Sequence, residues 1–157
     1  CTIVHVSEQC YRRDMERSDF VLAVLATAQG SELTPVQLQK LFFILDRRCA
    51  ERAGGPFFEF APYDYGPFDA TVYREVEALE RRGLASITVP AGFSMKTYKL
   101  TPEGQRVGAA LLEALDESIR NFASAVSSAV RSMSFSDLVS AVYREFPEMK
   151  ANSIFRG

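Results

Sequence analysis

The chain has 157 residues, 47% hydrophobic and 24% charged, a size and composition typical of one globular domain with a continuous core. Its net charge of −2 excludes a strong overall attraction to nucleic acid. No stretch approaches the roughly 18 uninterrupted apolar residues that indicate a membrane span, and the first residues lack the order of a signal peptide. The sequence therefore predicts a cytoplasmic protein without membrane association.

The beginning of the chain differs in pattern from the rest. Residues 2–6 fit a short strand, but the segment that follows is polar and irregular up to Met15, where a clean helical pattern begins. We therefore expect residues 1–17 to be an N-terminal extension. Residues 18–116 form the main domain and residues 117–157 form helices packed on it, within a single domain overall. The three cysteines, Cys1, Cys10 and Cys49, are an odd set without metal-ligand spacing, which fits a reducing compartment.

Apolar residues at helical spacing predict six helices. These cover residues 19–29, 35–53, 68–82, 102–115, 118–133 and 134–146, and the fourth and fifth can also be read as one helix. Thr34 and Gln37 form a capping box at the start of the second helix. This helix is apolar over most of its surface, so we expect it to be central. The tail after Phe146 is expected to be too short and polar to matter for the core.

Two alternating segments predict a β-hairpin after the third helix. Residues 85–89 and 97–100 alternate apolar and polar positions, and Gly92 lies in the connection between them. Thr101 is a good N-cap for the helix that follows, and Pro102 suits its first position. Helix, hairpin and capped helix in this order resemble the second half of a winged helix-turn-helix domain. The expected fold is mainly α, with a winged-helix-like core, a small β-hairpin wing and a helical C-terminal extension.

Residues that could carry catalysis are few. The only histidine, His5, lies in the extension, and Cys49 falls on the apolar face of the second helix, where packing is its expected role. The glycine pair at 54–55 lacks the Gly-Lys-Ser/Thr ending of a phosphate loop. Carboxylates such as Asp46 are scattered and stand beside basic residues such as Arg47. We therefore predict no catalytic, cofactor or metal site, and no enzymatic activity.

An aromatic segment points to protein binding. Residues 57–68 contain six aromatic side chains around a turn, with two prolines that limit the segment to a short edge strand and a turn. Aromatic residues beyond the needs of the core are typical of partner sites. The candidate protein-binding residues are Phe57, Tyr63, Tyr65 and Phe68. The alternative is that this segment only joins the third helix to the second.

The third helix and the wing supply the candidate DNA contacts. In a DNA-reading winged helix this helix would enter the major groove and the wing would touch the backbone. The candidate residues are Tyr73, Arg74, Arg81, Lys96 and Lys99. However, carboxylates outnumber basic residues in this helix, whereas a helix that neutralises phosphates is normally basic. The alternative is that the arginine side chains complement the helix dipole and the lysines are solvated.

The segments at residues 38–43 (Leu-Gln-Lys-Leu-Phe-Phe) and 65–67 (Tyr-Gly-Pro) resemble a bacterial family. In the SocA-like (Panacea-domain) antitoxins and the related YwgA-like proteins, a Leu-x-Lys-Leu helix precedes a Tyr-Gly-Pro turn, and residues 152–155 resemble the YwgA-like group. The resemblance implies an all-helical domain with a small wing and no enzymatic activity. Members of the antitoxin branch neutralise a toxin by binding it, and at least one presents its toxin to a protease. Lys40 and the turn at 65–67 are the hallmarks that it singles out.

Together these features predict a non-catalytic protein-binding module of a bacterial defence or toxin–antitoxin system, whose partner is another protein. The alternative is a winged-helix DNA-binding transcriptional regulator, with a homodimer through residues 118–146 as one form. Neither function requires a cofactor.

Overall fold

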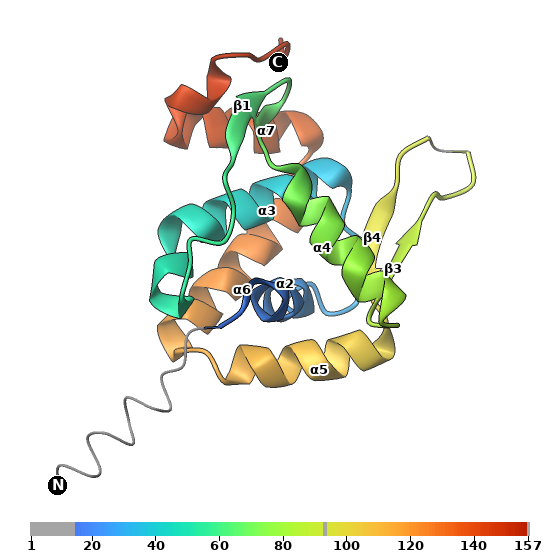
Figure 1. Ribbon diagram of the computed structural model, residues 1–157. Helices are drawn as coiled ribbons and strands as arrows, with labels where there is room; N and C mark the ends of the chain where they lie inside the picture. The colour runs from blue at the N-terminus through green and yellow to red at the C-terminus, as the bar shows by residue number, and fades with distance from the viewer. Residues whose placement is uncertain (1–14, 93, 157) are drawn as a thin grey trace, which may run out of the picture.

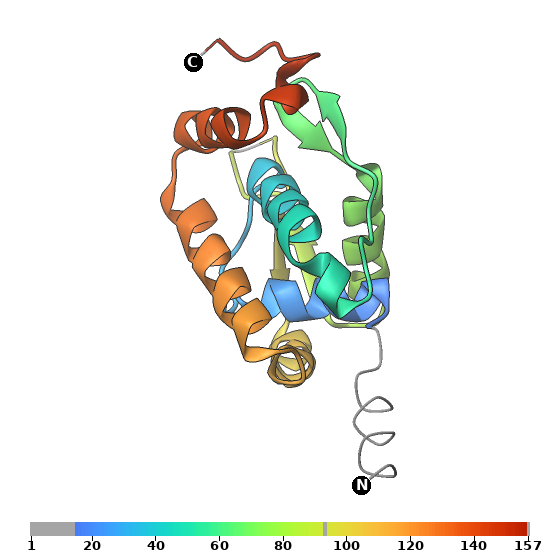
Figure 2. The same ribbon diagram turned by 90° about the vertical axis from the view of Figure 1, so that its left-hand side faces the viewer.

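The computed structural model describes residues 15–92 and 94–156, and it is mainly helical with two small β-hairpins (Figures 1 and 2). The α-helices are α2 (Arg17–Ala26), α3 (Pro35–Arg48), α4 (Ala70–Arg81), α5 (Pro102–Glu113), α6 (Glu117–Ser132) and α7 (Phe135–Glu145). Two 3₁₀ helices are η1 (Ala50–Ala53) and η2 (Pro147–Lys150). The antiparallel hairpins join β1 (Ala61–Tyr63) to β2 (Gly66–Phe68) and β3 (Ala85–Thr88) to β4 (Thr97–Leu100). The expected mainly α fold with a small β-hairpin wing is confirmed.

Helix α2 lies in the centre of the molecule, with α5 packed beneath it (Figure 1). Every α2 residue from Phe20 to Ala26 is buried. The close approach of α5 depends on Gly108, where a Cβ would come within 2.6 Å of the carbonyl oxygen of Leu22. A larger residue at this position would therefore push the two helices apart.

Helix α3 is the second central helix, as its apolar pattern predicted, and the expected capping box is present. Thr34 Oγ1 accepts a hydrogen bond from the Gln37 amide at 3.3 Å, and Gln37 Oε1 accepts one from the Thr34 amide at 2.9 Å. The helix ends earlier than expected, at Arg48, because Cys49 leaves the helical conformation with φ −141°. The short η1 turn then continues to Gly54, whose φ of +110° ends it.

The connection between α3 and α4 contains a hairpin where the sequence predicted a short edge strand and a turn. Pro62 lies opposite Pro67 in the two three-residue strands, and their missing amides limit the length of the pairing. Helix α4 begins at Ala70, two residues later than expected, because Asp69 caps it by accepting from the Thr71 amide at 2.9 Å. Phe68, where the helix was expected to begin, is instead the last residue of β2.

The second hairpin is the expected wing, with Ala85 paired to Leu100 at its base. Leu33, between α2 and α3, exchanges two backbone hydrogen bonds with Tyr98 of β4, at 2.8 and 2.9 Å. The base of the wing is therefore joined to the segment between the two central helices, while its tip projects from the body (Figure 1).

The C-terminal helices cover one side of α3 (Figure 2). Helices α5 and α6 are separate, with α5 ending at Glu113 and α6 beginning at Glu117. Ser134 caps α7, accepting from the Asp137 amide at 3.1 Å. The expectation that the tail does not matter for the core is wrong, because Met149 is buried in it.

Most of the predicted N-terminal extension, including the strand expected at residues 2–6, lies outside the described residues. Met15 is joined to the body, since its amide donates to the Ala53 carbonyl at 2.8 Å. No described helix is long and apolar enough to cross a membrane.

Candidate protein-binding site

The β1–β2 hairpin is fixed from below by a buried lysine. Lys40 of α3 is only 3% exposed, and its Nζ donates to the Pro67 carbonyl at 3.3 Å. Gly66 lies directly above, with φ +107°, and a Cβ on it would stand 3.3 Å from Lys40 Cε. Burial lowers the pKa of Lys40 from 10.5 to about 8. This hydrogen bond joins Lys40 to Pro67, which is 27 residues further along the chain. The two segments singled out by the family resemblance therefore meet in space and have a structural role.

The hairpin is fixed from the side by the C-terminal tail. The Ile154 amide donates to the Asp64 carbonyl at 2.9 Å, and the Ser153 hydroxyl donates to the same carbonyl at 3.2 Å. Tyr143 of α7 holds Ser153 through a hydroxyl–hydroxyl hydrogen bond of 2.6 Å. The tail thus holds the turn of the hairpin in place.

Two tyrosine side chains stand out from this fixed hairpin. Tyr63 is 55% exposed and Tyr65 is 43% exposed. The Tyr63 ring stacks on Phe68 with centroids 5.2 Å apart, whereas the Tyr65 ring packs edge-on against Phe135 of α7, also at 5.2 Å. Each ring therefore has one packed side while much of its surface faces solvent.

An aromatic row leads from Tyr63 into the molecule. Phe68 packs against Tyr73 of α4 at 5.8 Å, and Tyr73 stacks on Tyr98 of β4 at 5.6 Å with an interplanar angle of 16°. Burial raises the pKa of Tyr73, and it raises that of Tyr98 to about 12. The row couples the hairpin to α4 and to the base of the wing, and it occupies the Tyr73 side chain that was a candidate DNA contact.

Phe57 belongs to the edge of the core, since its ring packs on Phe20 with centroids 4.8 Å apart. Its backbone amide and that of Phe58 donate to the Asp46 carboxylate at 2.7 and 3.3 Å. Burial raises the pKa of Asp46 although both hydrogen bonds favour its charged form. Asp46, which stands beside Arg47 in the sequence, is therefore an anchor for the chain before β1.

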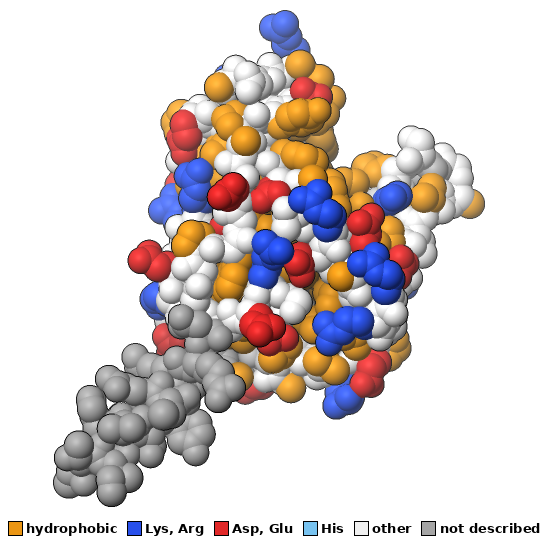
Figure 3. Space-filling model, viewed as in Figure 1, with side chains coloured by type: hydrophobic (Ala, Val, Ile, Leu, Met, Phe, Trp, Pro, Cys, Tyr) orange, Lys and Arg blue, Asp and Glu red, His pale blue; other side chains and the backbone are white. Residues whose placement is uncertain are grey.

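The candidate DNA-binding residues do not form one basic surface. Arg74 and Arg81 are both exposed on α4, two turns apart, and Lys96 is exposed on the wing. Lys99 follows Tyr98 and therefore projects from the other face of the strand, where it pairs with Glu32 at 3.9 Å. Acidic and basic side chains are interspersed over the α4 side of the molecule (Figure 3), while hydrophobic side chains gather above, over the β1–β2 hairpin.

The side chain first considered for nucleophilic chemistry has a packing role. Cys49 is buried, and burial raises the pKa of its thiol, so it is a poor nucleophile. His5 lies outside the described residues. Within residues 15–92 and 94–156, no three His, Cys, Asp or Glu side chains gather as a metal site would require.

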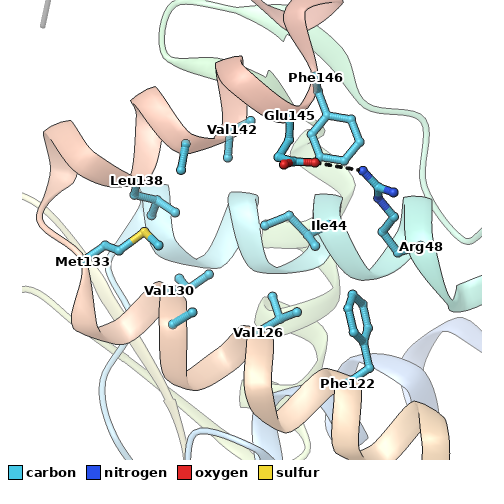
Figure 4. A pocket seen from close by; sticks show the side chains of 12 residues that line it. Ile44, Arg48, Phe122, Val126, Val130, Met133, Leu138, Val142, Glu145 and Phe146 are labelled. Atoms are coloured by element: carbon cyan, nitrogen blue, oxygen red, sulfur yellow. Dashed lines mark hydrogen bonds and ion pairs between the residues drawn. The ribbon is translucent and has the colours of Figure 1, made fainter.

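A groove between α3, α6 and α7 was not expected from the sequence (Figure 4). Its volume is about 330 Å³, and its walls are almost entirely apolar. The lining side chains include Ile44, Phe122, Val126, Ala129, Met133 and Leu138. Phe122 is 36% exposed at one end of the groove. Apolar residues cover an arc of α6 that is wider than packing against a single helix requires. This wide apolar arc is the feature of the sequence that could have indicated the groove.

In comparisons with known proteins, no family model, curated protein or solved structure matches this chain.

Proposed function

We propose that this chain is a non-catalytic protein-binding module of a bacterial defence or toxin–antitoxin system, acting in the cytoplasm. The observation that carries the proposal is the pair of exposed tyrosines, Tyr63 and Tyr65, on a hairpin that is held by α3 and by the C-terminal tail. The link to toxin neutralisation rests on the family resemblance of residues 38–43 and 65–67.

The physical support comes from the low entropic cost of a fixed aromatic side chain. Tyrosine supplies a large amphipathic contact area with few rotatable bonds. Because the hairpin is already ordered by Lys40 below and Ile154 beside it, binding a partner requires little further ordering of the backbone. Phe68 and Phe135 support the two rings from behind, so that the exposed ring faces are presented in defined positions.

The test is capture of the partner from the native host, followed by affinity measurement with the purified partner. Tyr63→Ala and Tyr65→Ala should each weaken binding by about 2 kcal/mol or more, about 30-fold in Kd. Their melting temperatures should stay close to that of the wild type, because both side chains are substantially exposed.

Val89→Ala on the wing is the matched control, since Val89 is 55% exposed, as Tyr63 is. It should leave the affinity unchanged. If both tyrosine variants melt early and keep full affinity, the hairpin is a packing element and the proposal is wrong.

A winged-helix DNA-binding regulator is the second candidate function. Its support is the arrangement of three helices followed by a hairpin, in which Leu33 joins the base of the wing. Two observations weigh against it. Residues 49–69 separate α3 from α4, whereas a helix-turn-helix has a turn of about three or four residues. Helix α4 also carries more carboxylates than guanidinium groups.

DNA binding is tested with a fragment of the promoter of the chain's own operon. If it occurs, affinity should fall steeply with salt concentration, and the double variant Arg81→Glu with Lys96→Glu should abolish it. Tight binding by this double variant would reject α4 and the wing as the DNA-binding surface.

A further inference from the structure

The two exposed tyrosines of the β1–β2 hairpin are supported from different parts of the molecule. The Tyr63 ring stacks on Phe68, and Phe68 begins the aromatic row that ends at the buried Tyr98 in the base of the wing. The Tyr65 ring instead packs on Phe135, which is itself 45% exposed at the start of α7. Tyr63 is therefore supported by the body of the protein, whereas Tyr65 is supported by another surface side chain.

The backbone at the two tyrosines differs in the same way. Tyr63 is the last residue of β1 and is paired with Gly66 of β2, which lies over the buried Lys40. Tyr65 lies in the turn at residues 64–65, outside both strands. The position of Tyr65 therefore depends more strongly on contacts from outside the hairpin.

The end of the C-terminal tail, residues 152–156, contributes to the support of Tyr65. The Phe155 ring packs edge-on against Phe135 with centroids 6.1 Å apart, and it also packs on Tyr143 of α7 at 6.2 Å. Edge-on aromatic pairs at such separations are favourable. Among the described residues, Tyr65 and Phe155 are the two aromatic side chains that pack on Phe135. A contact of the tail thus reaches the Tyr65 ring through Phe135.

A single hydroxyl group also joins the tail to the turn of the hairpin. Ser153 Oγ donates to the carbonyl of Asp64, the residue before Tyr65, at 3.2 Å. The same oxygen accepts from the Tyr143 hydroxyl at 2.6 Å and from the Phe155 amide at 3.0 Å. The Ser153 side chain therefore connects the hairpin, α7 and the tail at one point.

Residues 152–156 have few other attachments to the body. They form no helix or strand, and Asn152, Ile154 and Arg156 are exposed. A segment with few buried apolar contacts and with exposed hydrogen bonds opens at a free energy well below that of global unfolding. Residues 152–156 can therefore leave the body while the core stays folded.

We propose that residues 152–156 are a conformational switch for Tyr65. While they are docked, Tyr65 is held in the position that a partner contacts; when they are released, Tyr65 becomes mobile and Tyr63 stays in place. The effect on binding rests on the proposed function of the hairpin, whereas the coupling between these residues and the Tyr65 ring does not. A ligand or modification that keeps the segment released would therefore weaken one half of the binding surface.

The test is fluorine NMR of the full chain labelled with 3-fluorotyrosine, in which the signals of Tyr63 and Tyr65 are assigned by replacing each with phenylalanine. Ser153→Ala removes the hydroxyl that connects the three segments, and Phe155→Ala removes the aromatic contact of the tail. In each variant the Tyr65 signal should move toward the chemical shift of a free tyrosine and become narrower, because a released ring averages over its rotamers. The Tyr63 signal should keep its wild-type position.

Phe122→Ala is the matched control, since this phenylalanine is 36% exposed on α6, away from the hairpin (Figures 1 and 4). It should leave both signals in place. A Tyr65 signal that stays in place in both tail variants would overturn the proposal. So would equal movements of the Tyr63 and Tyr65 signals, which indicate that the whole hairpin has loosened.

Affinity for the partner purified from the native host separates the switch from the proposed function. A tail variant whose Tyr65 signal has moved should bind about 5-fold or more weakly. Adding Tyr65→Ala to it should change little further, whereas adding Tyr63→Ala should give the sum of the two effects. If Tyr65→Ala weakens binding but neither tail variant does, the switch is wrong and the proposed function stands. If both tyrosine variants bind normally while the Tyr65 signal responds to the tail, the proposed function is wrong and the coupling stands.

Discussion

Replacing Lys40 with methionine tests the buried ammonium beneath the hairpin. Lys40→Met keeps a side chain of similar volume but removes the charge and the hydrogen bond to the Pro67 carbonyl. Because burial lowers the pKa of Lys40 from 10.5 to about 8, the folded state binds this proton more weakly than the unfolded state. Below pH 8 the ammonium is charged in both states, and its burial destabilises the fold in full. As the pH rises from about 8 to 10.5 this penalty disappears, so wild-type stability rises across that window.

The size of the effect follows from the same values. Each pKa unit corresponds to about 1.4 kcal/mol, so the lowering from 10.5 to about 8 corresponds to about 3 kcal/mol. Leaving the Pro67 carbonyl without its donor costs about 1–3 kcal/mol at every pH. At pH 7 the variant should therefore equal the wild type or exceed it by up to about 2 kcal/mol. Near pH 10.5 it should be less stable by about 1–3 kcal/mol.

The assay is urea unfolding followed by circular dichroism at several pH values between about 7 and about 10.5, with the wild type and the variant compared at each pH. Groups that titrate equally in both proteins cancel in this difference. Lys96→Met, at an exposed position on the wing, is the matched control for the removal of a lysine charge. If the difference for Lys40→Met is constant across this range, the ammonium is not desolvated and the reasoning is refuted.

Three further predictions concern the core and the tail. Leu41→Ala should cost about 2–5 kcal/mol of unfolding free energy, because Leu41 is fully buried in α3; a loss below about 1 kcal/mol would contradict a central α3. Gly104→Ala should destabilise by more than about 1–3 kcal/mol, since its Cβ would collide with the Leu84 carbonyl oxygen; a wild-type melting temperature would refute this close approach. Ending the chain after Ala151 removes the hydrogen bonds of the tail to the hairpin and should speed chymotrypsin cleavage at Tyr65; unchanged cleavage would show that the tail does not hold the turn.

The helices and their beginnings were readable from the sequence because each depends on residues a few positions apart. The capping pair of Thr34 and Gln37 and the cap at Thr101 are present as predicted. The wing strands also match closely, since alternation is a local property of a strand. The predictions were less accurate at Phe68, where Pro67 and the Asp69 cap delay the helix and leave the preceding residues to a second hairpin.

Exposure of the candidate site residues was decided only by contacts between distant segments. Phe57 and Tyr63 look alike in an aromatic run, yet Phe57 packs on Phe20 of α2 while Tyr63 remains more than half exposed. No residue near either of them in the sequence distinguishes the two.

The sequence by itself determined the class of fold, the order of its elements and a buried role for Cys49, because helical period, capping and composition are properties of short segments. Only the tertiary structure placed Lys40 beneath Gly66, set Ile154 against Asp64 and opened a groove beside Phe122. The physical reason is that desolvation and exposure depend on which surfaces the folded chain brings together. Those surfaces belong to segments that are separated by tens of residues, and no local pattern records their meeting.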